Sequence, residues 1–149
     1  MTQEDKELLL KDLCARLNTN LVCSIYRTDD QGIGYRNEIL HGYCNIDAWD
    51  EFYFGEDCGI SINDISKIKP YLFPLSSMTK EQLFEVQEIL GKNEIEIGDG
   101  FLHIIDSDRN TITYLEILAL LEWFYKNHFD IYELIPMGLA IDATGLNIY

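Results

Sequence analysis

The chain has 149 residues, of which 47% are hydrophobic and 25% charged, values typical of a single folded domain that buries its own core. Its 26 acidic and 11 basic residues give a net charge of −15, which argues against sequence-independent binding to nucleic acid or to anionic lipid. Four cysteines without a C-x-x-C pair, no signal-peptide pattern and no bilayer-spanning apolar stretch predict a cytoplasmic protein with reduced thiols.

Residues 3–17 are predicted to form the first helix, with Thr2 as its N-cap. Apolar side chains recur along it at the spacing of one helical face: Leu10, Leu13, Cys14 and Leu17. Alternating apolar residues then predict three strands, at 21–28, 37–46 and 51–56. Residues 29–34 and 47–50 are predicted turns between these strands.

The second half of the chain is predicted to alternate helices with a hairpin. Pro70 and Pro74 hold residues 70–78 extended, and Thr79 with Gln82 forms a capping box for a helix that ends near Gly91. The Gly-Asp-Gly sequence at 98–100 predicts a hairpin of two strands.

A further capping box, Thr113 with Glu116, opens a helix over 114–127, and Asp130 with Glu133 is expected to cap a last short helix before Pro136. The fold class that follows is α+β. It is a single domain with an antiparallel sheet of about five strands, three main helices and a short C-terminal helix.

The sequence DSDRNTITYLE at 106–116 is similar to a calcium-binding EF-hand loop. Asp106, Asp108 and Asn110 fit ligand positions 1, 3 and 5 of such a loop. Position 6 is then a threonine where an EF-hand needs glycine, and position 12 is Ile117, which cannot bind a cation. We therefore interpret the segment as a polar turn before a capped helix, with weak calcium binding by the three residues as the alternative.

Other patterns for chemistry are sparse. His41 and Cys44 lie three apart on a predicted strand and so point to opposite faces, which does not favour a zinc site. His128 and Asp130 could form an imidazole–carboxylate base, although residues of this kind are also common at helix junctions. Because no nucleophile motif, P-loop or dinucleotide fingerprint is present, we expect no cofactor and no enzymatic activity.

Two segments favour a role in binding another protein. Between residues 37 and 66 there are no basic residues, and aromatic side chains alternate with acidic ones. The candidate partner-binding residues are Asp47, Trp49, Asp50, Glu51, Tyr53, Glu56 and Asp57. In the alternative interpretation the aromatics face the core and the acids face water.

The second segment is the helix at 114–127, which is apolar almost all round. A helix of this kind is normally central to the core. If the sheet covers only one of its sides, the remaining apolar face is a surface for a partner or for a second copy.

Three segments, LLLKDLCARL (8–17), KPYLFPLSSMT (69–79) and LEWFYKNHFDIYELIPMGLAIDA (121–143), carry a family resemblance. The chain resembles a family of small, acidic, uncharacterised proteins of gut anaerobic bacteria, their mobile elements and their phages. It departs from the family pattern at Phe73, where a basic residue is usual, and at residues 131–134. The resemblance implies a genomic setting and no activity.

These observations predict a non-enzymatic accessory protein of phage or mobile-element origin that binds an unidentified, basic protein through an acidic surface. Homo-oligomerisation is compatible with the sequence, whereas membrane association and direct nucleic-acid binding are not expected. The alternative is a sponge for a small signalling nucleotide. That function would need Lys67, Lys69, Lys80 or Lys92 to gather around a pocket.

Overall fold

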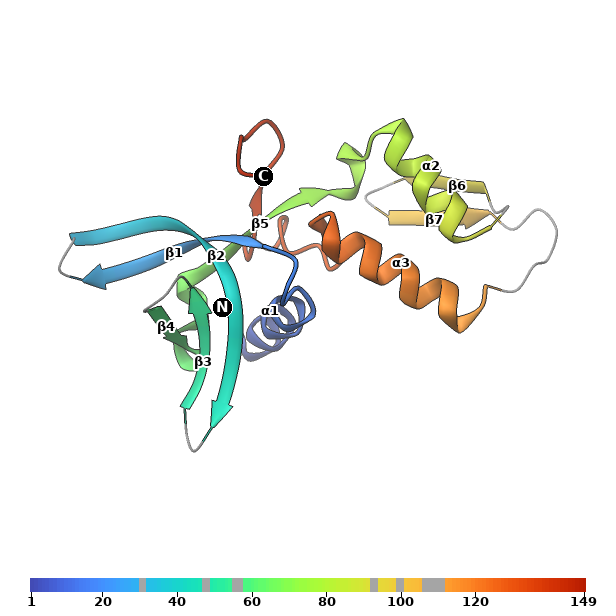
Figure 1. Ribbon diagram of the computed structural model, residues 1–149. Coiled ribbons are helices and arrows are strands. Elements are labelled where there is room, and N and C mark those ends of the chain that lie inside the picture. Colours follow the sequence, from blue (N-terminus) through green and yellow to red (C-terminus); the bar gives the residue numbers. More distant parts are fainter. Residues whose placement is uncertain (30–31, 47–48, 55–57, 92–93, 99–100, 106–111) are drawn as a thin grey trace.

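The computed structural model describes the chain except for residues 30–31, 47–48, 55–57, 92–93, 99–100 and 106–111, and except for the side chains of residues 29, 46, 49, 58, 94 and 101–105. Figure 1 shows two lobes that meet near the middle of the chain. One lobe joins a helix to a strongly bent sheet, and the other packs two helices against a small hairpin. No helix in the described part of the chain has the length and apolar character needed to cross a membrane.

The first lobe begins with α1 (Gln3–Ala15), for which Thr2 is the N-cap as predicted. The Thr2 hydroxyl accepts a hydrogen bond from the Asp5 amide at 3.1 Å, and the Asp5 carboxylate accepts one from the Thr2 amide at 2.7 Å. This capping box satisfies two of the amides that the first helical turn leaves unpaired. Leu9 and Leu13 are fully buried against the sheet, so α1 covers one face of the sheet.

Within the described residues, the main sheet has seven strands rather than five. Its antiparallel part has the order β4-β3-β2-β1-β5. The strands are β1 (Val22–Asp29), β2 (Gly32–Ile46), β3 (Trp49–Phe54), β4 (Cys58–Ser61) and β5 (Ile68–Pro74). A 3-10 helix, η1 (Ile62–Lys67), joins the last two.

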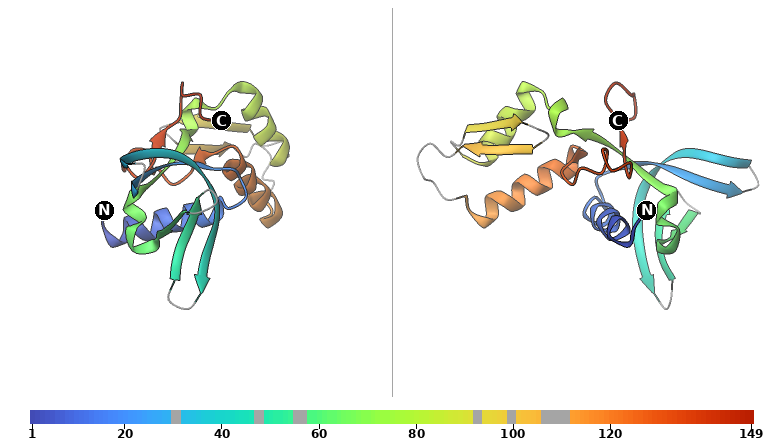
Figure 2. Two further views of the ribbon diagram at one scale, coloured as in Figure 1. Left: turned by 60° about the vertical axis from the view of Figure 1, so that its left-hand side comes forward. Right: turned by 180° about the vertical axis from the view of Figure 1, so that it is seen from behind.

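β2 is long enough to pair with two different neighbours. Its first half, to Ile39, pairs with β1, and its second half, from Leu40, pairs with β3 across a bulge between Leu40 and Gly42. A bulge bends a strand and increases its twist, and Figures 1 and 2 show β2 curving from the outer hairpin down along β3. The strand predicted at 37–46 was too short, because the glycines of residues 32–34 weaken the strand pattern without ending it.

The prediction of a purely antiparallel sheet was wrong. β5 pairs in parallel with two strands of two residues each, β8 (Phe129–Asp130) and β9 (Ile141–Asp142). The predicted hairpin at 94–105 does form, as β6 (Glu94–Gly98) and β7 (Phe101–Ile105), but it is a separate two-stranded sheet. The fold remains α+β.

The predicted short C-terminal helix was also wrong, since residues 134–138 form turns. Glu133 and Gly138 have φ angles of 58° and 72°, in the left-handed region that an α-helix does not use. Asp130 still acts as a cap, because its two carboxylate oxygens accept hydrogen bonds from the amides of Leu134 and Ile135 at 2.9 and 2.8 Å.

The second lobe packs β6 and β7 against α2 (Lys80–Ile89) and α3 (Tyr114–Lys126), after the 3-10 helix η2 (Leu75–Ser77). Both capping boxes predicted here are confirmed: Thr79 with Gln82 starts α2, and Thr113 with Glu116 starts α3. The core of this lobe consists of Leu75, Val86, Leu90, Ile95, Leu120, Phe124 and Phe129. It is distinct from the core between α1 and the main sheet.

Candidate functional site

The described part of the acidic aromatic segment predicted as a partner surface lies on β3. Its described candidates are Asp50, Glu51 and Tyr53, together with the backbone of Trp49. Outside the described residues lie Asp47, Glu56, Asp57 and the side chain of Trp49. Because successive side chains of a strand point to opposite faces, Asp50 lies on one face of β3, and Glu51 and Tyr53 lie on the other.

The Asp50 carboxylate is hydrogen-bonded to two side chains of the neighbouring strand. Its Oδ1 accepts hydrogen bonds from the Tyr43 hydroxyl and from Asn45 Nδ2, the latter at 2.8 Å, and both donors lie on the neighbouring strand β2. The bond to the carboxylate raises the pKa of Tyr43. Asp50 therefore stabilises the pairing of β2 with β3.

The aromatic residues of β3 divide in the way that strand alternation requires. Phe52 and Phe54 are fully buried in the core under α1, whereas Tyr53 is 38% exposed on the outer face. Glu51 lies over Gly59 of β4, where a Cβ atom would collide with its carboxylate. The described part of β3 thus presents only Glu51 and Tyr53 outward, which is less than the surface predicted from the sequence.

The calcium candidates Asp106, Asp108 and Asn110 lie outside the described residues, so weak calcium binding stays a prediction. The residues that follow them form the predicted helix cap. The Glu116 carboxylate accepts a hydrogen bond from the Thr113 amide at 2.6 Å, which lowers the pKa of Glu116. Among the described residues, no group of three or more histidine, cysteine or carboxylate side chains is arranged to hold a metal ion.

His128 and Asp130 have separate structural contacts. The imidazole is 8% exposed, at a residue with a φ of 59°, and its ring stacks on the Tyr149 ring with centroids 4.0 Å apart. Burial, and the nearby Arg16 guanidinium, lower the pKa of His128 to about 4. Asp130 holds the amides of residues 134 and 135. The two side chains are therefore not oriented as a base and its carboxylate.

A buried ion pair at the junction of the two lobes was missed at the sequence level. Asp12 and Arg16 are both 0% exposed, and they form a bidentate pair with N–O distances of 2.8 and 2.9 Å. Arg16 also donates a hydrogen bond of 3.4 Å to the carbonyl of Tyr125, in the last turn of α3. It donates another, of 2.7 Å, to the carbonyl of Phe129, just beyond the end of α3. The signal in the sequence was an Asp–Arg pair at i,i+4 on the same helical face as Leu9 and Leu13.

Burial and pairing act in opposite directions on this ion pair. Burial raises the pKa of the Asp12 carboxyl, and the Arg16 guanidinium opposes that rise. Because the guanidinium also donates to the carbonyls at the end of α3, its charge is compensated both by a carboxylate and by the negative end of the helix dipole. The pair therefore joins α1 to α3.

Among the described residues, one shallow hollow of about 160 Å³ lies between α1 and η1, and another of about 120 Å³ lies beside Pro74 and Asp130. Pockets for drug-sized ligands are usually about 300–1,000 Å³. The larger hollow, between α1 and η1, contains Lys6 beside Glu7, and the smaller contains Asp130 and Glu133 but no basic residue. Neither hollow has the basic lining that a nucleotide sponge would need, and Lys92 lies outside the described residues.

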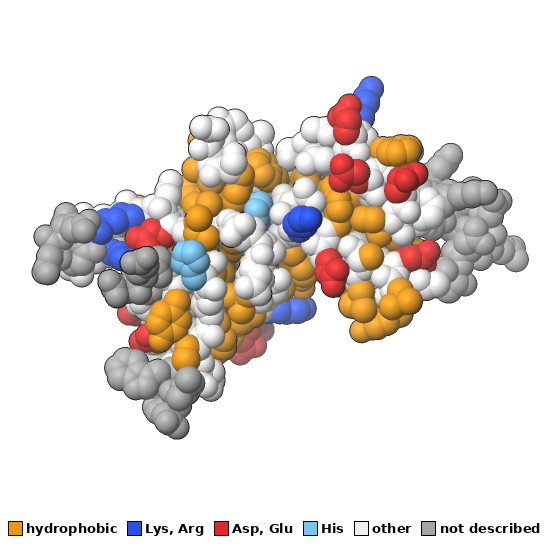
Figure 3. Space-filling view, viewed as in Figure 1, with side chains coloured by type: hydrophobic (Ala, Val, Ile, Leu, Met, Phe, Trp, Pro, Cys, Tyr) orange, Lys and Arg blue, Asp and Glu red, His pale blue; other side chains and the backbone are white. Residues whose placement is uncertain are grey.

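The largest departure from expectation is the exposed face of α3. The helix buries Leu120 and Phe124, but four apolar side chains near its start are between 38% and 75% exposed: Tyr114, Leu115, Ile117 and Leu118. With the half-buried Leu121, we call these residues the α3 seam. Figure 3 shows hydrophobic side chains gathered over the start of α3, with acidic side chains around them and on α2. Of the two interpretations of this helix, the one with a single covered side agrees with this exposure, and a helix enclosed in the core does not.

Comparisons with known proteins found no matching family model, no matching curated protein and no matching solved structure.

Proposed function

We propose that the chain is a protein-binding accessory protein whose α3 seam docks a basic amphipathic helix of another protein. The observation that carries the proposal is the exposure of the seam on the most apolar helix of the chain. Single exposed apolar residues are ordinary on protein surfaces, but a contiguous group on one helix is typical of an interaction site. The family resemblance adds a setting in phages or mobile elements.

The spacing of the seam favours a helical partner. Tyr114, Leu118 and Leu121 follow one another at i, i+4 and i+7, which places them in one row along the helix. Leu115 and Ile117 lie on either side of that row. A row of this spacing fits the groove between the side-chain ridges of a second helix.

The surrounding charge favours a basic partner. The exposed Glu122 lies next to the row on α3. The glutamates of α2 are farther from the row, since Glu85 accepts a hydrogen bond from Trp123, on the opposite side of α3. The net charge of −15 also disfavours an acidic partner. Glu122 and the net charge take the place of the β3 residues in favouring a basic partner, because Asp50 is hydrogen-bonded to Tyr43 and Asn45 and Glu51 lies on the opposite face of β3 from it.

The proposal can be tested with a synthetic helix of leucine and lysine at heptad spacing, added to the isotope-labelled protein. We expect chemical-shift changes at the amides of residues 114–122, and weaker binding at higher salt. A helix with glutamate in place of lysine is the matched control, which we expect not to bind. The double variant Leu115→Ser/Leu118→Ser should weaken binding of the basic helix at least about tenfold.

The variant Asp50→Asn/Glu51→Gln tests whether the partner binds at the α3 seam or at the candidate residues on β3. It should bind the basic helix as the wild type does. If it loses binding while the seam variant keeps it, the partner surface is on β3 and the assignment to α3 is wrong. Proteins from a bacterial lysate that both the wild type and the β3 variant capture, and that the seam variant loses, are candidates for the natural partner.

A further inference from the structure

The outer half of the β1–β2 hairpin reaches beyond the rest of the sheet. β1 pairs with β5 only over residues 23–25, and β2 pairs with β3 only from Leu40 onward. Within the described residues, the edge of β2 from Gly32 to Ile39 that faces away from β1 therefore has no strand beside it. Eight residues at about 3.3 Å each form an edge about 26 Å long.

This edge has few of the features by which proteins usually protect an exposed strand. Such edges are kept short, or carry charged side chains, above all lysine, or proline or a bulge. β4, at the end of the main sheet, has only four residues. The edge of β2 has the sequence GIGYRNEI, with one basic and one acidic residue and without proline or lysine. The bulge of β2 comes only between Leu40 and Gly42, where its pairing with β3 starts.

The two faces of the hairpin differ in charge. Ile33, Tyr35 and Ile39 lie on one face and are between 40% and 71% exposed. The residues that pair with this row on β1 are Thr28, Tyr26, Ser24 and Val22, so this face has no carboxylate. When two copies of the chain pair edge to edge along β2, this face therefore brings no carboxylates next to each other, although each copy has a net charge of −15.

The opposite face carries complementary charges two residues apart. Arg36 and Glu38 alternate with the apolar row. The Glu38 carboxylate is held on this face by Arg27, at 2.6 Å. A strand with a basic and an acidic residue at i and i+2 can pair with a second copy of itself so that each meets the opposite charge.

We propose that two copies of the chain form a dimer by antiparallel pairing of β2 with β2, across a two-fold axis at Asn37. This register places Arg36 opposite the partner subunit's Glu38, and Tyr35 opposite the partner subunit's Ile39. The pairing extends over residues 35–39 and stops at Leu40, where β3 occupies the same edge. It joins the two main sheets into one sheet across an isologous interface.

Neighbouring registers of the same pairing are less favourable. An axis at Arg36 would place two guanidinium groups opposite each other, and an axis at Glu38 would place two carboxylates opposite each other. Directly opposed like charges destabilise a sheet. Only the register at Asn37 combines opposite charges on one face with apolar pairs on the other.

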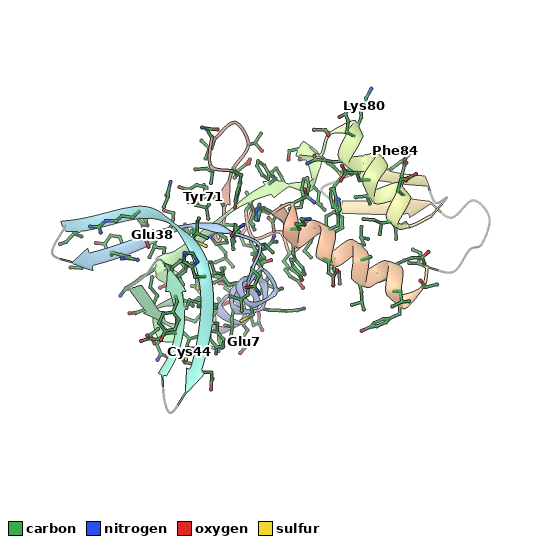
Figure 4. The ribbon with its side chains drawn as sticks, viewed as in Figure 1. Glu7, Glu38, Cys44, Tyr71, Lys80 and Phe84 are labelled. Carbon is green, nitrogen blue, oxygen red and sulfur yellow. The ribbon has the colours of Figure 1, made fainter. Side chains whose placement is uncertain are left out.

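The proposed dimer interface is separate from the α3 seam. Figures 1 and 2 show the outer hairpin and α3 in different lobes, on opposite sides of α1. In Figure 4, Glu38 lies at the hairpin end of the molecule, and Phe84 lies on α2 at the other end. The dimer is thus independent of the proposed function, and variants of the seam are controls for it.

Sedimentation equilibrium of the full chain tests the dimer and its register together. We expect the variants Arg36→Glu and Glu38→Arg each to weaken the dimer at least about tenfold, because each places like charges opposite each other. The double variant Arg36→Glu/Glu38→Arg restores opposite charges and should recover most of the lost association. Circular dichroism of each variant shows whether the chain still folds, since Glu38→Arg also removes the contact with Arg27.

A cross-link provides a second measurement that does not depend on these charges. The variant Asn37→Cys places one cysteine on each side of the proposed axis. Paired residues in an antiparallel sheet have Cα atoms about 4.5–5.5 Å apart, within disulfide reach. We expect this variant to form a disulfide-linked dimer under mild oxidation, faster than the wild type and faster than Ile33→Cys.

The dimer is wrong if the wild type sediments as a monomer at every concentration. The assignment to β2 is wrong if the double variant is no better than the single variants, or if Asn37→Cys cross-links no faster than Ile33→Cys. A dimer that is lost in Leu115→Ser/Leu118→Ser and kept in Arg36→Glu would instead place the interface at α3.

Discussion

α1 and α3 are each 13 residues long, begin with a capping box and bury apolar side chains, yet α1 also encloses charge whereas α3 leaves apolar side chains exposed. α1 buries Asp12 completely, and the residue after its end, Arg16, is also fully buried. α3 is the most apolar helix of the chain, but it leaves Tyr114 and Leu115 more than 70% exposed. The composition of a helix therefore did not determine its burial.

The neighbours of each helix explain the difference. α1 lies between the bent sheet and the end of α3, so its polar residues are enclosed and must find partners there. α3 is covered on one side by α2 and by the β6–β7 hairpin, and the start of α3 slopes away from the hairpin (Figure 2). An enclosed charge indicates a structural contact, whereas an uncovered apolar face indicates a surface for another molecule.

The largest expected effect comes from breaking the enclosed ion pair. Arg16→Met leaves the Asp12 carboxylate buried without its partner and leaves the carbonyls at the end of α3 without a donor. We expect a loss of about 3–5 kcal/mol in the free energy of unfolding, measured by urea denaturation.

The control for this change is the double variant Asp12→Leu/Arg16→Met, which removes both charges. It should lose much less stability than Arg16→Met alone, because no uncompensated charge remains. A loss below about 1 kcal/mol in the single variant would mean that α1 is held by Leu9 and Leu13 alone.

A second pair of variants compares the two sides of α3. Leu120→Ala removes a buried side chain from the second core and should cost about 2–4 kcal/mol in the free energy of unfolding. Leu118→Ala, half a turn away on the seam, should change it by no more than about 0.5 kcal/mol. Equal losses of stability in the two variants would show that Leu118 is buried in solution. The proposal that the seam binds a partner would then be wrong.

Local patterns predicted the elements well. The caps at Thr2, Thr79 and Thr113 and the β6–β7 hairpin depend on residues within a few positions of one another, and all are confirmed. The strand alternation that separates Asp50 from Glu51 is equally local, because it follows from the residue numbers along β3. That alternation by itself divides the candidate surface on β3 between the two faces of the strand.

Features that depend on distant residues could not be predicted in the same way. The parallel pairing of β8 and β9 with β5 joins segments more than 50 residues apart, through strands too short to have a pattern. The exposure of the α3 seam depends on which side of α3 is covered by α2 and the hairpin, which the sequence of α3 does not contain. For Asp130 the cap was predicted but the helix was not formed, because Glu133 takes a left-handed conformation.

The junction of α1 and α3 should also respond to pH through His128. Burial lowers its pKa in the folded protein to about 4, from an ordinary value of 6.5. Between these values the unfolded chain binds a proton that the folded chain does not, so stability is complete above about pH 6.5 and falls as the pH drops towards 4. We expect a loss of about 2 kcal/mol, below the linkage limit of about 3 because the ring keeps some contact with water.

Urea denaturation at pH 7 and pH 4.5 measures this loss. The variant His128→Asn is the matched control, because asparagine tolerates the φ of 59° at this position. The difference in stability between the wild type and the variant should shrink as the pH falls. A difference that does not change with pH would show that the imidazole is not buried in its neutral form.

The smallest expected effect is at the exposed end of α3, where Thr113 caps the helix. Thr113→Ala removes the acceptor for the Glu116 amide and should cost about 1 kcal/mol, measured by thermal unfolding. The first turn, with Tyr114 and Leu115, has little tertiary cover, so the loss should appear there as fraying, seen as faster amide exchange at residues 115–117. Thr79→Ala, the same change at the cap of α2, should leave that exchange unaltered. Thr113 and Thr79 form the same kind of cap on two different helices. If Thr113→Ala weakens binding of the basic helix and Thr79→Ala does not, the first turn of α3 therefore belongs to the binding surface.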